Sequence, residues 1–353
     1  MSGLQGLEGV VVAETRLSEV DGERGVLILA GHNVESLAPG TTFEEAATLF
    51  GARGDLGEAR HAAFQRIGAL GDALLREDGM DALRAAVAHL DGRSSPEEVI
   101  GAVAVYAAAW ARRGRPAIAP DPSLPHAADY LRMIDGETPS EARVNALDAY
   151  LVTVSDHGMN ASTFAARVVA STGSDLTSAV VAAIGALKGP LHGGAPGPVL
   201  DMLDAIGTPD RAADWLGNEL ASGRRIMGMG HRIYRVRDPR AAVLERAIEG
   251  FENAPSAPVK TERLALARAV ERAAEGVLRA RHPSRPLHAN VEFYTAVLLD
   301  AVGLHRTAFT PTFAVGRVVG WAAHVAEQRA TGRLIRPASK YIGVMPESGQ
   351  VRA

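Results

Sequence analysis

Cysteine is absent from the 353-residue sequence. This absence excludes disulfide bonds, thiolate metal sites and thiol nucleophiles, and it is compatible with a reducing cytoplasm. Aromatic residues are scarce at 5%, and the formal net charge of -4 comes without any block of basic residues. Because surfaces that bind nucleic acids are strongly basic, we expect no nucleic-acid partner.

Long hydrophobic runs are missing as well. The longest apolar run, 99–111, falls short of the ~20 residues that a membrane-spanning helix needs. The first ten residues, MSGLQGLEGV, lack the basic and apolar regions of a secretory signal. Metal-binding spacings such as HExxH or an acidic calcium loop do not occur either. We expect a soluble, cytoplasmic protein with no membrane partner and no metal.

What the sequence does contain is a repeated signal for the start of a helix. A hydroxyl residue at N-cap, proline at N1 and acidic residues behind them suit the free amide groups of a first turn. The signal occurs at Ser95-Pro96-Glu97-Glu98, at Thr138-Pro139-Ser140-Glu141 and at Thr208-Pro209-Asp210, and Thr42-Phe43-Glu44-Glu45 is a further capping box. Alanine-rich stretches with a helical period follow these starts.

Strand signals are confined to the N-terminus. Residues 10–20 and 25–31 are rich in β-branched and aliphatic residues, and they flank Asp21-Gly22, a dipeptide typical of hairpin turns. Proline and glycine cluster at 189–198 and at 282–286, and two such breaks predict a smaller, hinged unit between them. The sequence therefore predicts a mainly α-helical protein with a small N-terminal β-hairpin and two unequal domains.

His192 lies in the proline- and glycine-rich stretch 188-KGPLHGGAPGPVL-200, ahead of a helix expected to begin near Pro198. The positive end of a helix dipole disfavours the cationic form of a histidine, so a neutral ring there can donate a hydrogen bond. The alternative is an ordinary loop histidine in a helix–helix turn, and spacing alone slightly favours this alternative.

His231 follows two glycines in the stretch 227-MGMGHRIYRVRDPR-240, which is rich in arginine. Guanidinium groups grip carboxylates or phosphates with two parallel hydrogen bonds, so the stretch indicates an anion site. A solvated basic face explains the composition equally well. Asp238-Pro239 predicts a turn just before the last arginine. The arginines are Arg232, Arg235, Arg237 and Arg240.

His157 stands between Asp156 and Gly158 in 155-SDHGMNASTFAAR-167, where one helical segment ends and another begins. A neighbouring carboxylate can orient an imidazole ring, which would suit a functional histidine. The alternative, and the better one on composition, is a helix-capping cluster of Asp156, Asn160 and Ser162.

Arg317 is the only charged residue between Phe309 and Ala323. An arginine buried without a partner is prohibitively costly, so it must meet an anion. That anion is either a structural carboxylate or the carboxylate of a substrate.

Glu292 is the single carboxylate in the first turns of the apolar segment 289-ANVEFYTAVLLDAVG-303, where Asn290 is a candidate N-cap. In isolation such a glutamate is usually a favourable charge at the positive end of a helix. The residue type also suits a general base.

Taken together, these segments resemble the citrate synthase family nearly from end to end. The resemblance implies an almost all-helical homodimer with a large domain, 1–194 and 304–353, and a small mobile domain, 195–303. The motifs that carry the resemblance follow one another in family order: LEGVVVAETRLSEVDGERGVL (7–27), GHNVESLA (31–38), SDHGMNAST (155–163), KGPLHGG (188–194), MGMGHRIYRVRDPR (227–240), ANVEFYTAVLL (289–299), FAVGRVVGW (313–321) and LIRPASKYIG (334–343).

The resemblance implies condensation of acetyl-CoA with oxaloacetate to citrate and CoA, without a metal or redox cofactor. The reaction needs a base and a donor for the thioester oxygen in the enolisation step, and a second donor for the ketone under attack. By family position, Glu292 is the base, His192 donates to the thioester oxygen and His231 donates to the oxaloacetate carbonyl. The remaining positions implied are His157, Arg240, Arg317 and Arg336 of the partner subunit for the dicarboxylate, and Arg235 for the CoA phosphates.

Two departures from the better-known members affect this interpretation. Those members carry aspartate at the position of Glu292, and Ala-Asn-Glu where this chain has Ala195-Pro196-Gly197. The extra methylene moves a base by roughly 1 Å, a displacement that can lower a rate about a hundredfold unless the backbone compensates. We interpret both as marks of a subgroup. The alternatives are a 2-methylcitrate synthase that uses propionyl-CoA and a non-catalytic relative that binds CoA or a dicarboxylate.

Overall fold

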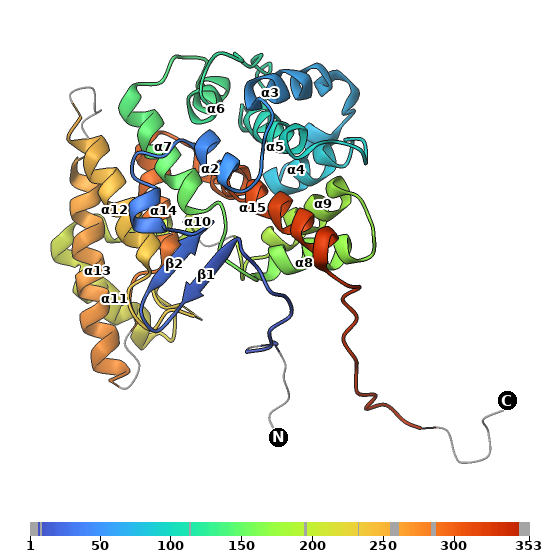
Figure 1. The fold of residues 1–353 in the computed structure, drawn as a ribbon. Coiled ribbons are helices and arrows are strands. Elements are labelled where there is room, and N and C mark those ends of the chain that lie inside the picture. Colours follow the sequence, from blue (N-terminus) through green and yellow to red (C-terminus); the bar gives the residue numbers. More distant parts are fainter. Residues whose placement is uncertain are drawn as a thin grey trace.

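The computed structural model describes residues 6–7, 9–112, 114–193, 196–231, 233–254, 261–283 and 287–345, without the side chains of Thr261 and Glu262. Ala195 and Arg232 therefore lie outside the described residues. Most of the described chain is helical, and one small sheet lies at the lower edge of the helical body in Figure 1. The predicted mainly α-helical fold is confirmed.

The helices fix the frame of the molecule. The predicted helix after the proline- and glycine-rich loop begins at Pro196, two residues before the expected start. In chain order the described α-helices and 3-10 turns are α1 (Val34–Leu37), α2 (Phe43–Leu49), α3 (Leu56–Gln65), η1 (Ile67–Ala69), η2 (Ala73–Leu75), α4 (Gly79–Val87), α5 (Pro96–Ala111), α6 (His126–Asp135), α7 (Glu141–Thr153), α8 (Ala161–Ser171), α9 (Leu176–Leu187), α10 (Pro196–Ile206), η3 (Pro209–Arg211), α11 (Ala212–Ala221), α12 (Pro239–Glu252), α13 (Thr261–Arg281), α14 (Val291–Ala301), η4 (Arg306–Ala308) and α15 (Phe309–Thr331).

The helix-start signals are confirmed in part. Complete capping boxes begin α2 at Thr42 and α5 at Ser95. The box predicted from Thr138 is wrong, because Ser140 is the N-cap of α7 and accepts from the Arg143 amide at 3.4 Å. Thr208 precedes only the 3-10 turn η3 and makes no capping hydrogen bond from its side chain.

The N-terminal hairpin is confirmed, but it is shorter than predicted. Strands β1 (Ser18–Asp21) and β2 (Val26–Leu29) pair antiparallel with Ser18 opposite Leu29, and β3 (His32–Asn33) adds a third strand. Residues 10–17 are not a strand, and at the end of this segment side chains take the amides: Arg16 N donates to Glu327 at 2.9 Å and Leu17 N to Thr15 at 3.2 Å. The connection is the four-residue turn 22–25, not a two-residue turn.

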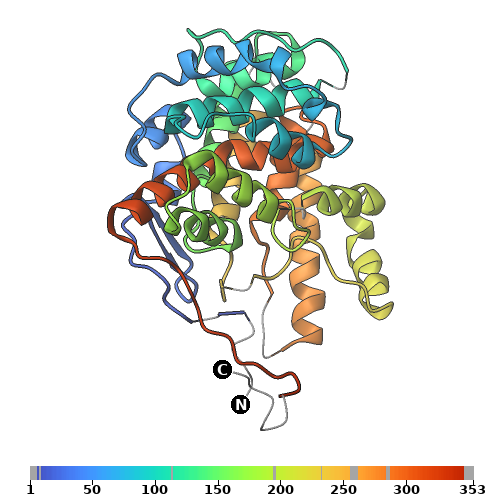
Figure 2. The same ribbon diagram turned by 90° about the vertical axis from the view of Figure 1, so that its right-hand side faces the viewer.

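The core is built around α5 and α15, helices that are buried along most of their length. α15 crosses the middle of the molecule in Figure 2 and packs against α5, α7, α8 and α9. α12 packs against α7 and α14, and α11 packs against α13. The division into a large and a small domain at 195 and 303 stays a prediction. None of the described helices is long and apolar enough to cross a membrane.

The chain leaves the helical body after α15. Residues 332–345 run in an extended course away from the helices, as both ribbon views show (Figures 1 and 2). Apolar side chains on this segment face solvent: Tyr341 is 68% and Ile342 90% exposed. We refer to residues 332–345 as the C-terminal arm.

Candidate active site

Loops and helix ends bring most of the predicted polar side chains to one place. His157 follows α7, and His231 precedes α12. Their ring centroids lie 5.7 Å apart in an edge-on arrangement. The positive charge of Arg240 shifts the pKa of each other member of this group. The group consists of His157, His192, His231, Arg240, Glu292 and Arg317.

Two predicted residues lie apart from this group. The side chain of Arg235 is 54% exposed, and its one carboxylate neighbour within the described residues is Glu23 at 3.9 Å. Arg336 is exposed on the C-terminal arm. Arg237, from the same arginine-rich stretch as Arg235, forms an ion pair with Glu271 at 2.8 Å. The described arginines of this stretch form ion pairs with different carboxylates. The stretch is thus neither a single anion site nor a single solvated face.

Arg240 is oriented by the aspartate that begins its own helix. Asp238 is the N-cap of α12, and its carboxylate accepts from Nε and Nη2 of Arg240 at 3.0 and 2.7 Å. The same carboxylate accepts from the Val291 amide at 3.2 Å, which ties the start of α12 to the start of α14. The sequence indicates only a turn at Asp238-Pro239. The structure shows an N-cap that also fixes the guanidinium group.

His231 is held as a neutral ring that carries its proton on Nε2. Its Nδ1 accepts from the amides of Ile233 and Tyr234 at 3.0 and 3.1 Å, so Nδ1 has no proton. Arg240 Nη2 lies 3.4 Å from Nε2, a longer contact that cannot be a hydrogen bond while Nε2 is protonated. Burial and the nearby Arg240 lower the pKa of His231 to about 4. The ring is therefore a neutral donor through Nε2.

His192 is held as a neutral ring by a serine hydroxyl. Its Nε2 lies 2.8 Å from Ser162 Oγ, which also accepts from Trp321 Nε1 at 3.1 Å. The same hydroxyl donates to Asn160 Oδ1 at 2.8 Å, an oxygen that also accepts from the amides of Ser162 and Thr163. The serine thus holds the Nε2 edge of the His192 ring and leaves Nδ1 facing away from it. Burial lowers the pKa of His192 to about 4, with a further contribution from Arg317.

His157 is oriented by a tyrosine that the sequence analysis did not identify. The hydroxyl of Tyr234 lies 3.1 Å from His157 Nε2. Burial and the charges of Arg240 and Arg317 hold the pKa of His157 well below its usual range, so this ring is neutral as well. Tyr234 is part of the stretch after His231, yet nothing in its spacing relates it to a residue on another loop.

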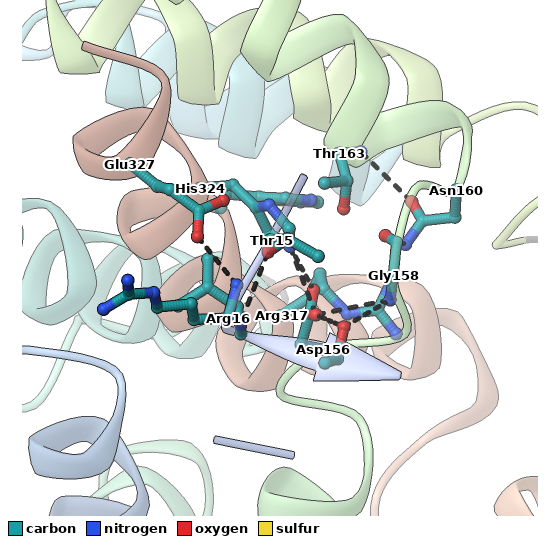
Figure 3. Close-up of polar contacts among 12 residues, drawn as sticks. Thr15, Arg16, Asp156, Gly158, Asn160, Thr163, Arg317, His324 and Glu327 are labelled. Carbon is teal, nitrogen blue, oxygen red and sulfur yellow. Dashed lines mark hydrogen bonds and ion pairs between the residues drawn. The ribbon is translucent and has the colours of Figure 1, made fainter. Parts of the chain in front are cut away.

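Asp156 does not orient His157, which corrects the expectation from their adjacency. Its carboxylate lies 3.2 Å from His324 Nε2, and His324 Nδ1 lies 2.8 Å from a guanidinium nitrogen of Arg167 (Figure 3). Asp156 also bonds the hydroxyl of Ser18. Burial opposes ionisation of Asp156, but its contacts with His324 outweigh burial and the pKa lies below its usual range.

The helix-capping cluster expected around His157 reduces to one residue. Asn160 is the N-cap of α8 and accepts from the Thr163 amide at 3.1 Å (Figure 3). Ser162 lies inside the helix, and its hydroxyl contacts the His192 ring. The carboxylate of Asp156 contacts His324. The two interpretations of this segment therefore hold side by side, since one motif supplies both a cap and site contacts.

Arg317 is buried without an ion pair among the described residues. It is 1% exposed, and its Nε donates to the Val154 carbonyl at 2.5 Å. Its guanidinium lies 4.9 Å from the centre of the Phe313 ring. Burial lowers the pKa of Arg317 to about 10, although the charge of Asp156 opposes the shift. Because burial destabilises the charged form of Arg317, binding of an anionic ligand beside it would be favourable.

Glu292 is rigidly placed by the first turn of α14. Asn290 is the N-cap, as expected, and accepts from the Glu292 amide at 3.0 Å. Burial raises the pKa of the Glu292 carboxyl to about 7, and the positive charge of Arg240 opposes the shift only in part. A carboxylate with such a pKa is a stronger base than an ordinary glutamate.

The chemistry that this arrangement allows is deprotonation next to a carbonyl. Glu292, a base of raised pKa, and the neutral imidazole rings all lie within electrostatic reach of Arg240, and such rings can stabilise an oxygen on which negative charge develops. The buried guanidinium groups of Arg240 and Arg317 can hold a second, anionic molecule. Proton abstraction and carbon–carbon bond formation are therefore within reach of one site.

The chain is similar to proteins whose family is known. The family model described as citrate synthase, C-terminal domain, matches residues 6–338. A citrate synthase of Deinococcus radiodurans is 35% identical over 366 residues, which cover 96% of this chain and 95% of that protein. A 2-methylcitrate synthase of Mycobacterium tuberculosis is 36% identical over 365 residues, covering 96% and 90%.

Solved structures give the same result. A citrate synthase of the archaeon Thermoplasma acidophilum, in ternary complex with carboxymethyl coenzyme A and oxaloacetate, is similar with a TM-score of 0.86. The two chains are 28% identical in sequence, and the similarity covers 97% of each. The agreement therefore extends over the whole fold.

Proposed function

Because this chain belongs to the citrate synthase family, whose members are acyltransferases, we propose that it condenses acetyl-CoA with oxaloacetate and hydrolyses the product to citrate and CoA. The observation that supports the proposal most directly is the placement of Glu292, with its raised pKa, among neutral histidines and buried arginines. These residue types match the base, the hydrogen-bond donors and the cations that the proposed reaction needs.

The first step is removal of a proton from the methyl group of acetyl-CoA. Glu292 takes this proton, and the Nδ1–H of His192 donates to the thioester oxygen as the enol forms. Methyl protons of a thioester are barely acidic in water, so the hydrogen bond must strengthen where negative charge develops. This donor requires the proton of His192 on Nδ1, a tautomer that the Ser162 hydroxyl favours when it donates to His192 Nε2 and not to Asn160.

The second step is attack of the enol on the ketone of oxaloacetate. The Nε2–H of His231 polarises the ketone oxygen, while His157, Arg240 and Arg317 bind the two carboxylates. Hydrolysis of the resulting thioester releases CoA. Arg235, whose side chain is 54% exposed, is the residue we propose for the CoA phosphates.

Arg336 is proposed to reach the dicarboxylate of a partner subunit. The C-terminal arm carries Arg336 away from its own helical body, and its exposed apolar side chains call for a covering surface. A second copy of the chain in a homodimer meets both needs. Sedimentation of the purified protein tests the dimer directly, and a monomer at micromolar concentration would contradict it.

Propionyl-CoA is the alternative acyl donor. Identity to the 2-methylcitrate synthase, 36%, is as high as identity to the citrate synthases, 35 and 37%. One extra methylene in a pocket changes transition-state binding by only ~1–3 kcal/mol, so use of both donors is compatible with the site. A non-catalytic binding protein is less well supported, because Glu292 and the histidines are all in place.

The deciding experiment measures CoA release from acetyl-CoA and from propionyl-CoA, each with oxaloacetate. A thiol reagent suits this assay because the protein contains no cysteine of its own. We expect turnover with acetyl-CoA. A kcat/KM at least tenfold higher with propionyl-CoA would establish the alternative, and no release from either donor by folded protein would refute the enzymatic proposal.

The rate should depend on pH through Glu292. Only the ionised carboxylate can accept a proton, and burial places its pKa near 7. We therefore expect kcat/KM to fall about tenfold per unit as pH decreases below 7, and to level off above it. The residual rate of Glu292→Gln should lack this acidic limb; a flat profile for the unmodified protein would exclude Glu292 as the base.

Ser162 should matter for catalysis through its contact with His192. Ser162→Ala removes the hydroxyl that lies against His192 Nε2, and we expect kcat to fall about tenfold, the equivalent of one hydrogen bond. The KM for oxaloacetate should stay within about twofold. Ser222→Ala, at an exposed hydroxyl that follows α11, is the matched control. An unchanged kcat in Ser162→Ala would show that the hydroxyl does not set the tautomer.

A further inference from the structure

The N-terminal hairpin touches the turn that carries His157. Ser18, the first residue of β1, accepts from the Gly158 amide at 3.0 Å and bonds the carboxylate of Asp156. A side chain on Gly158 would place its Cβ 3.3 Å from Val20. Strand β1 therefore lies directly against the segment next to His157, although the two are far apart in sequence.

The other end of the hairpin touches the loop that carries His231. Gly22 accepts from the Arg235 amide at 2.9 Å. A Cβ on Gly22 would lie 2.4 Å from the Ile233 carbonyl oxygen, and one on Gly25 would lie 2.6 Å from Val236. The φ angle of Gly22 is not positive, so the contact alone requires glycine at this position.

The carbonyl that faces Gly22 belongs to a peptide group that also holds His231. The N–H of the same peptide group is that of Tyr234, which donates to His231 Nδ1 at 3.1 Å. A peptide group is planar, so a push on its oxygen tilts its N–H. The hydroxyl of the same tyrosine lies against His157. The hairpin turn thus lies in close contact with the peptide group between Ile233 and Tyr234, which connects the rings of His231 and His157.

We propose that the N-terminal hairpin is a positioning element of the active site, in which Gly22 sets the place of His231 relative to His157. Ser18 fastens the hairpin to the turn beside His157, and the 22–25 turn supports the loop 227–238 from outside. The hairpin acts through the histidines, not on a substrate. This inference rests on the oxaloacetate-binding roles proposed above.

Gly22→Ala tests the inference. The added Cβ would stand 2.4 Å from the Ile233 oxygen, where ordinary contacts begin at 3.4 Å, so the peptide group must move by about 1 Å. A displacement of that size can lower a rate about a hundredfold. We expect kcat/KM for oxaloacetate to fall at least tenfold, the KM for acetyl-CoA to change less than twofold, and amide hydrogen exchange of residues 233–235 to become faster.

Gly68→Ala is the matched control, because its added Cβ meets nothing within 4 Å and its φ is not positive. Its kinetics and exchange should equal those of the unmodified protein. Unchanged kinetics in Gly22→Ala would overturn the inference, whether or not exchange of the loop becomes faster. In that case the hairpin supports the loop but does not position His231.

Ser18→Ala adds no bulk and serves if Gly22→Ala does not fold. It releases the hairpin from the turn beside His157, and we expect a several-fold rise in the KM for oxaloacetate with faster exchange at residues 233–235. Wild-type values for both would overturn the inference. If the unmodified protein releases no CoA from any donor, the proposed function fails by itself. Calorimetric binding of oxaloacetate to Gly22→Ala and Gly68→Ala then decides on the hairpin.

Discussion

Glutamine in place of Glu292 is expected to lower kcat at least ~100-fold, the usual effect of losing a general base. Glutamine keeps the shape and the helix-start position of the side chain, but it cannot accept the methyl proton of acetyl-CoA. The KM for oxaloacetate should change little, because Arg240 and Arg317 remain. Steady-state CoA release measures both quantities, and near-normal turnover would place the base elsewhere.

A first-turn glutamate also interacts with its helix dipole, and this contribution needs its own control. Glu58 occupies the first turn of α3 behind the N-cap Asp55 and is exposed. Glu58→Gln should leave kcat unchanged. Glu292→Asp should lower kcat as well if the site is built around the longer side chain, whereas a gain would show that glutamate is a handicap here.

Methionine in place of Arg317 is expected to weaken oxaloacetate binding at least ~30-fold, since truncating a buried charged partner costs about 2–5 kcal/mol. The ligand-free protein should become more stable. Its buried guanidinium has no ion pair within the described residues, and removing an unpaired buried charge removes a desolvation cost. Calorimetry with oxaloacetate and thermal unfolding without ligand measure the two effects.

Arg60 provides the contrasting variant. It is fully buried like Arg317, but it forms an ion pair with Asp129 at 2.7 Å. Arg60→Met removes the fully buried partner of that carboxylate and leaves it only Arg132, at 2.7 Å, and breaking this buried pair should cost about 3 kcal/mol of folding free energy. If both arginine variants lose stability alike, Arg317 is a structural residue and not a waiting anion site.

Local signals could be predicted from the sequence, because their partners lie within one turn. The capping boxes at Thr42 and Ser95 and the N-cap at Asn290 need only residues two or three positions away. The box at Thr138 failed for a local reason too. Ser140, two residues later, offers the same hydroxyl, and the helix begins after it.

The side chains that contact the site residues come from distant parts of the sequence, so local signals do not identify them. Adjacency predicts that Asp156 orients His157, but the partners of Asp156 are Ser18 and His324, 138 and 168 residues away. The hydroxyl that contacts His192 Nε2 comes from Ser162, 30 residues away. Residue type and family order pointed to the histidines and arginines. Only the fold shows which atom of each ring is free.

Helix α15 places its polar residues on one face at intervals of three and four. Arg317 reaches the site, Trp321 bonds Ser162, His324 bonds Asp156 and Glu327 binds Arg167. Successive residues of an α-helix are rotated by ~100° about the helix axis. Inserting or deleting a single residue after Arg317 would therefore rotate Trp321, His324 and Glu327 away from their partners. We therefore expect relatives of this chain to vary in length in their loops but not between residues 317 and 327.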